Sequence, residues 1–124
     1  MVNKTWDSLV DEYHDLIDVA GRVEYTLHAE AMLRILPDLR EHFSQPDIIK
    51  YTSHTTLTLQ VPPNPVQLCV WGEDSGKFRI YLYQYDRREA ISRVFQERIV
   101  NEAEVIATIA EFLHLLRHPE PSVS

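Results

Sequence analysis

Two runs of alternating apolar and polar residues flank a short turn between positions 66 and 85. The runs read VQLCVWG and KFRIYLYQY, and the turn between them reads EDSG. Alternation with a period of two sends successive side chains to opposite faces of a β-strand, and a short glycine-containing connection joins two such strands as a hairpin. The sequence therefore predicts strands at 66–71 and 77–85, with Asp74, Ser75 and Gly76 closing the hairpin.

A further strand is predicted directly before this hairpin. Residues 51–61 are rich in β-branched and aromatic types, and Leu57, Leu59 and Val61 alternate with polar neighbours. These residue types favour a pleated, half-buried strand. The connection at 44–50 contains a Pro-Asp turn signal, and three prolines soon after Val61 end the strand.

Residues 90–99 follow the polar turn Asp86-Arg87-Arg88-Glu89. Four of them are large and apolar, namely Ile91, Val94, Phe95 and Ile99. Their alternation is poor, so the spacing favours a fourth strand and leaves a helical start as the alternative.

Two helices are predicted before the strands. Apolar residues within 6–20 recur at steps of three and four, opposite a row of aspartates, which is typical of an amphipathic helix. Gly21 is suited to end this helix or to allow a bend. A second periodic set extends over 22–43, where Pro37 removes a backbone donor and crowds the preceding turn. We expect this second helix to kink or restart near Leu36.

A third helix is predicted near the C-terminus. A wide apolar stripe covers 105–116, and Asn101 is followed three residues later by Glu104, as in a capping box. Two prolines at positions 119 and 121 prevent the helix from continuing. We expect a flexible tail at 119–124.

The predicted fold class is α+β. Sequential strands joined by short polar turns favour an antiparallel meander of three to four strands. The two N-terminal helices and the C-terminal helix are expected to pack on one face of this sheet. At 124 residues the chain fits a single domain, which we assign to 1–118.

The composition of the chain indicates the cellular compartment in which it works and the classes of partner that it can bind. No apolar run approaches the roughly 20 residues that a membrane span requires, and the first residues lack a signal-peptide pattern. A single cysteine, Cys69, agrees with a reducing compartment, so we expect a cytoplasmic protein. The net charge of −7 opposes binding to a nucleic acid backbone.

One face of the predicted hairpin carries large aromatic residues whose role has to be explained. In strand 77–85 three apolar residues point to one side, and in both strands large polar and aromatic residues point to the other. The residues on this second side that we predict to bind a partner are Trp71, Arg79, Tyr81, Tyr83 and Tyr85. Protein interfaces favour tyrosine and tryptophan. The alternatives are a small-ligand surface, or a face that a helix covers as part of the core.

Signatures of enzyme chemistry are absent from the sequence. His114 and His118 have the spacing of two metal ligands on one helical face, but no third ligand follows, so helix capping is the simpler interpretation. Cys69 lies inside a strand, where a thiol usually packs as a small apolar side chain. We therefore predict no catalytic residue, no metal site and no cofactor.

The first functional hypothesis is a non-catalytic protein-binding module, such as an adaptor, a chaperone or an inhibitor of the immunity type. Its partner is another protein, itself as a homodimer, or both. The tyrosine-bearing sheet face makes the contact, and the acidic first helix attracts a basic partner. The alternatives are a small enzyme, with His54, Cys69 or a tyrosine as proton-transfer group in a cleft between sheet and helices, and a fragment of a larger assembly.

Overall fold

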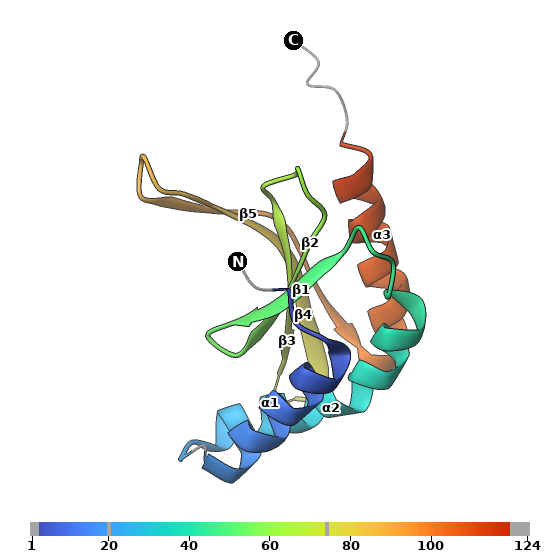
Figure 1. Cartoon of the computed structure of the whole chain (residues 1–124). Coiled ribbons are helices and arrows are strands. Elements are labelled where there is room, and N and C mark those ends of the chain that lie inside the picture. Colours follow the sequence, from blue (N-terminus) through green and yellow to red (C-terminus); the bar gives the residue numbers. More distant parts are fainter. Residues whose placement is uncertain (1–2, 20, 74, 120–124) are drawn as a thin grey trace.

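The computed structural model describes residues 3–19, 21–73 and 75–119. The described chain forms two N-terminal helices, an antiparallel sheet and one C-terminal helix, which confirms the α+β class. Figure 1 shows how these elements are arranged. The elements are α1 (Trp6–Val19), α2 (Val23–His42), β1 (Ile49–Ser53), β2 (Thr56–Gln60), β3 (Gln67–Gly72), β4 (Lys77–Asp86), β5 (Ile91–Asn101), a 3₁₀ turn (Glu102–Glu104) and α3 (Val105–Arg117).

The sheet is an antiparallel meander in the order β1-β2-β3-β4-β5. The meander is confirmed, but the expected number of strands, three to four, is wrong because the sheet has five. The segment predicted as one strand at 51–61 is a hairpin of β1 and β2, with Ser53 paired to Thr56. His54 and Thr55 form its two-residue turn with φ values of 51° and 69°. Such turns normally carry asparagine or glycine, so this one had no sequence signal.

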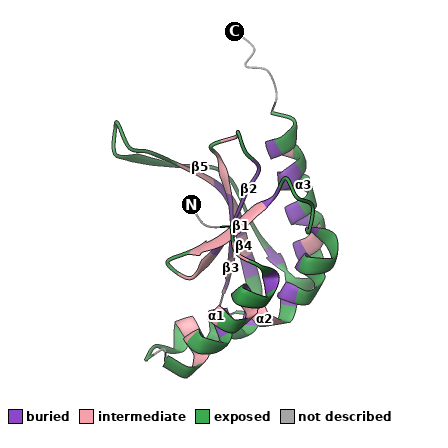
Figure 2. Ribbon diagram, in the orientation of Figure 1, coloured by how far each residue is buried: buried purple, intermediate pink, exposed green. Residues whose placement is uncertain are grey.

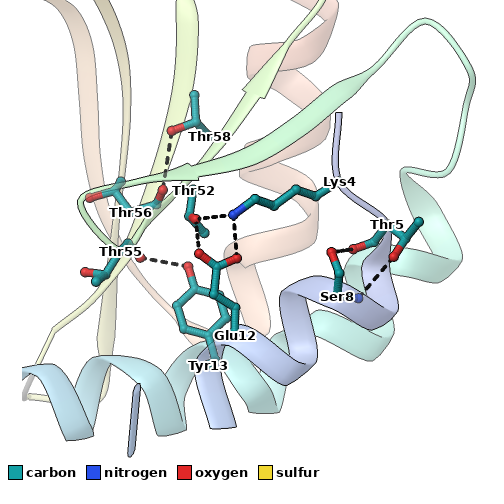
Figure 3. A network of polar contacts seen from close by, with 9 residues as sticks. All are labelled: Lys4, Thr5, Ser8, Glu12, Tyr13, Thr52, Thr55, Thr56 and Thr58. Carbon is teal, nitrogen blue, oxygen red and sulfur yellow. Dashed lines mark hydrogen bonds and ion pairs between the residues drawn. The ribbon is translucent and has the colours of Figure 1, made fainter. Parts of the chain in front are cut away.

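One side chain from α1 and one from α2 form hydrogen bonds to this turn from the interior of the protein. The Tyr13 hydroxyl donates a hydrogen bond of 2.8 Å to the Thr55 carbonyl oxygen (Figure 3). His28 Nε2 lies 2.8 Å from the same oxygen, and the Gly72 amide donates to His28 Nδ1 over 2.9 Å. His28 is therefore the neutral tautomer with its proton on Nε2, and it joins the turn to the end of β3.

The hydrophobic core lies between the sheet and the helices, where the buried sides of both layers face one another (Figure 2). The inner face of the sheet carries the apolar residues that the alternation predicted. They are Leu57, Leu59, Leu68, Val70, Phe78, Ile80 and Leu82. α2 packs against β3, and α3 packs against β3 and β4. At Gly72 the strand approaches α2 so closely that an added Cβ would lie 2.6 Å from the Ala31 Cβ.

The predicted restart of the second helix is wrong, because α2 continues without a break across Pro37. Leu36 and Leu39 on either side are fully buried. Their packing outweighs the one backbone hydrogen bond that proline removes, since most helical stability in proteins comes from tertiary contacts. The capping box of Asn101 and Glu104 is confirmed, and it caps the 3₁₀ turn that leads into α3.

Residues 91–99 belong to strand β5, as the first interpretation proposed, whereas Ala90 is part of the turn before it and has a φ of 52°. The pairing of β4 with β5 shifts between Leu82 and Tyr83, so that Phe95 is an extra residue between Val94 and Gln96. A β-bulge of this kind interrupts the alternation of side chains, which explains the poor pattern.

The predicted tail lies mostly outside the described part of the chain, which ends at Pro119. Among the residues that the structure does describe, no helix is both long enough and apolar enough to span a membrane.

Candidate functional site

The tyrosines of β4 lie on the face of the sheet opposite the core. The strand register sets Arg79 beside Ile99, Tyr81 beside Glu97 and Tyr83 beside Val94. We define the outer aromatic face by six residues, Arg79, Tyr81, Tyr83, Tyr85, Val94 and Ile99. Among the described residues, the packing of α2 and α3 against the sheet involves the opposite face. The alternative of a helix covering these tyrosines as part of the core therefore does not hold for this part of the chain.

Polar contacts orient the side chains of this face. Arg79 Nη2 donates to Glu97 Oε2 over 2.7 Å, and its guanidinium lies 4.4 Å from the centre of the Tyr81 ring. The hydrogen bond to Glu97 raises the pKa of Arg79 above its ordinary value. The Tyr83 hydroxyl lies 3.0 Å from Ser92 Oγ. The face therefore presents aromatic rings in fixed positions, and the positive charge of Arg79 at one end of the row is already paired.

The outer aromatic face continues onto an open strand edge. β5 is the last strand of the sheet, and every residue from Tyr85 to Ile99 is exposed. Val94, Phe95 and Ile99 keep 48 %, 48 % and 56 % of their surface exposed. An exposed, apolar edge strand is a template for contact with another chain, and natural proteins usually blunt it or use it.

The far end of the β4–β5 hairpin extends beyond the rest of the sheet. Pairing with β3 stops at Tyr83, whereas β4 and β5 stay paired as far as Asp86 and Ile91. In Figure 1 this part is the yellow-orange hairpin that projects away from the other strands. We call residues 84–93 the arm.

Trp71 lies apart from the tyrosines. Its indole stacks on His28 with ring centroids 3.6 Å apart and meets Tyr25 edge to face, and both of these residues belong to α2. The pairing of β2 with β3 ends at Leu57 and Val70. Because no strand residue flanks Trp71 on that side, its ring turns around the end of the sheet toward the helix.

The three groups named for an enzyme lie together on the outer face, around a hollow of about 260 Å³ that His54, Cys69, Tyr81 and neighbouring hydroxyl side chains line. They do not lie between sheet and helices, where the core is. Burial raises the pKa of Cys69 to about 11 and that of Tyr81 to about 12. Both groups therefore keep their protons at neutral pH, which is the opposite of what a nucleophile or a general base requires.

The other histidines offer no metal centre in the described residues. The rings of His114 and His118 lie 4.7 Å apart, but no group of three or more potential ligands occurs in the described ranges.

Sequence reasoning missed the structural role of His28. A usable signal was present, because His28, Met32, Ile35 and Leu39 recur at the spacing of one buried helical stripe.

Comparison of the chain with known proteins finds no match. The chain matches no family model, no curated protein and no solved structure.

Proposed function

We propose that this protein is a non-catalytic, cytoplasmic binding module that associates with another protein through the outer aromatic face. The observation that carries the proposal is the row of tyrosines on β4, which is continuous with the exposed apolar side chains of β5. Adaptor, chaperone and inhibitor roles all depend on a contact of this kind.

The chemistry of the outer aromatic face favours a protein, rather than a small ligand, as its binding partner. Tyrosines bury a large area on binding while their hydroxyls stay hydrogen-bonded, and they are enriched among the residues that dominate binding energy. Tyr85 is half exposed and Tyr81 and Tyr83 are partly exposed, so they have surface left to bury. The hollow beside them, of about 260 Å³, lies just below the lower limit of about 300 Å³ for typical ligand pockets.

The state of the ionisable groups supports a role without catalysis. Cys69 and Tyr81 hold their protons at neutral pH. His28, whose pKa falls to about 4, is buried and uses both ring nitrogens in hydrogen bonds. A buried free thiol also fits a reducing compartment such as the cytoplasm.

The test is affinity purification of the tagged chain from native cytosol, followed by native mass spectrometry. We expect a stoichiometric complex, either with a second copy or with a different protein. The Tyr83→Ala/Tyr85→Ala variant should lose that complex while it remains folded. Val23→Ser is the control, because it removes an exposed apolar side chain from α2, outside the outer aromatic face, and should keep the complex.

A bare monomer at every concentration, with no protein companion, would overturn the proposal. So would a complex that the double tyrosine variant retains in full, because the contact would then lie on another surface.

A further inference from the structure

We infer that the partner is a second copy of this chain, and that the arm of each copy docks on α1 of the other. This inference rests on the proposed function and names its partner. The reasons are the charge of the arm, the charge of α1, the hollow beside α1 and the distance between the two within one chain.

Charge is distributed unevenly along the sequence. Residues 77–98 carry six basic and three acidic side chains, whereas the rest of the chain carries six basic and sixteen acidic ones. Three arginines of the arm, Arg87, Arg88 and Arg93, are exposed and form no ion pair with any described residue. With Asp86 and Glu89 also in the arm, residues 84–93 carry a net charge of +1 on a protein whose net charge is −7.

α1 carries the opposite charge in the same number. Asp11, Asp15 and Asp18 are exposed and make no ion pair within the described ranges. Their spacing puts them on one side of the helix, where they span roughly 10 Å at 1.5 Å per residue. The distance along the strand from Arg93 to the tip of the arm is also roughly 10 Å, at about 3.3 Å per strand residue. The two charged rows match in number and in length, and they are opposite in sign.

Apolar surface accompanies the charges on both sides. A hollow of about 210 Å³ lies beside the aspartates, and its lining, which includes Leu16 and Val19, is mostly apolar. Tyr13 and Glu12, seen in Figure 3, also line it. On the arm, Ile91 keeps 45 % of its surface exposed and lies beside Asp86, Glu89 and Arg93. The exposed apolar side chain of Ile91 is therefore available to enter the apolar hollow beside α1.

The arm cannot reach the hollow of its own chain. Thr55 lines the hollow and immediately precedes β2. β2 begins at the same end of the sheet as β4, so the hollow lies near the start of β4. The arm continues from the other end of β4, so about 20 Å of strand separates the two. Figure 1 shows the projecting hairpin and α1 at opposite ends of the molecule. A contact between them must therefore join two molecules, and a two-fold axis makes it twice.

Charge reversal with complementation tests this arrangement. The arm variant is Arg87→Glu/Arg88→Glu/Arg93→Glu, the helix variant is Asp11→Lys/Asp15→Lys/Asp18→Lys, and the control is Glu30→Lys/Asp38→Lys/Glu41→Lys on α2. Helix and control variants change the net charge equally. All nine positions are exposed, and lysine favours a helix more than aspartate does, especially in its last turn. Folding is therefore preserved.

Sedimentation velocity gives the dimer dissociation constant for each protein. We expect the arm and helix variants each to raise it by about 100-fold or more, because like charges then oppose one another at both contacts. The control should change it by less than about 10-fold. An equimolar mixture of arm and helix variants should regain the wild-type constant, because both contacts of the mixed dimer then pair opposite charges.

Any of four results would overturn the inference. In the first, wild type is a dimer and both reversed variants remain dimers of equal affinity. In the second, the mixture fails to form the mixed dimer. In the third, wild type is monomeric but holds a different protein through Tyr83, and the proposed function then survives while the inference fails. A monomer without any partner rejects both.

Discussion

The imidazole of His28 lies flat against the indole of Trp71, with the ring centroids 3.6 Å apart and the planes inclined by 10°. The same imidazole bonds to the Thr55 carbonyl and accepts a hydrogen bond from the Gly72 amide. One side chain of α2 therefore joins the β1–β2 turn, the end of β3 and the tryptophan that the sequence had assigned to a binding surface. The end of the sheet nearest α1 owes its shape to this histidine.

Loss of His28 should destabilise the protein strongly. His28→Ala removes two hydrogen bonds and a stacked ring from a site with no solvent exposure, and it leaves the Gly72 amide without its acceptor. We expect the free energy of unfolding to fall by about 3 to 4 kcal/mol. Urea unfolding measures it, and His14→Ala on the exposed side of α1 is the control. A loss below about 1 kcal/mol would contradict the role assigned to His28.

Stability should also decrease in mild acid because of His28. Burial lowers the pKa of His28 from 6.5 to about 4 in the folded chain, so the unfolded chain binds a proton at higher pH than the folded chain. The stabilisation is complete above about pH 6.5 and is lost as the pH falls toward 4. Its size is about 3 kcal/mol, at 1.36 kcal/mol for each pH unit.

Two-dimensional NMR of the imidazole resonances checks this directly. The His28 signals should stay those of a neutral ring with a proton on Nε2 until the pH approaches 4. Protonation of His28 near pH 6.5 in the folded protein would refute the prediction.

Gly72 should not accept a side chain. In Gly72→Ala the new Cβ would lie 2.6 Å from the Ala31 Cβ and 3.3 Å from the His28 carbonyl oxygen, so β3 and α2 would have to separate. We expect a loss of about 2 to 3 kcal/mol in the free energy of unfolding. Gly21→Ala is the matched control, because nothing lies within 4 Å of its added Cβ, and it should change stability by less than about 0.5 kcal/mol. Equal effects of the two substitutions would show that the close approach is not a constraint.

The β1–β2 turn should become more stable with glycine. Thr55 has a φ of 69°, which is unfavourable for a β-branched residue, and its buried hydroxyl has no hydrogen-bond partner among the described residues. Thr55→Gly removes both penalties and keeps the carbonyl that accepts from Tyr13. We expect a gain of about 1 kcal/mol. Thr56→Gly, one residue into β2, should instead destabilise, and a loss in both variants would mean that the turn is not strained.

Cys69 should react slowly with alkylating agents. With its pKa raised to about 11 by burial, only about one thiol in ten thousand is ionised at pH 7. Alkylation by iodoacetamide, followed by mass spectrometry, should be more than about 100-fold slower in the folded chain than in urea. Rapid alkylation of the folded chain would restore the thiol as a candidate nucleophile.

Local sequence signals predicted the parts of the fold that local chemistry determines. The alternation in Phe78, Ile80 and Leu82 identified the buried face of β4, and the pair Asn101 and Glu104 identified the cap before α3. The His54-Thr55 turn escaped prediction because its stabilising partner Tyr13 is 42 residues away in sequence. For the candidate site, too, local sequence signals predicted only the features that local chemistry determines. Alternation assigned Tyr81, Tyr83 and Tyr85 to one face, but the direction of the Trp71 ring depends on where β2 ends.

The measurement that tests the central claim most directly compares association with folding in Tyr83→Ala. The dissociation constant of the complex and the free energy of unfolding are determined for this variant and for wild type under the same conditions. A contact through the outer aromatic face predicts that association weakens by about 30-fold or more, whereas unfolding changes by less than about 1 kcal/mol. If association is unchanged, or if stability and association fall together by the same free energy, Tyr83 does not belong to a binding surface and the account is wrong.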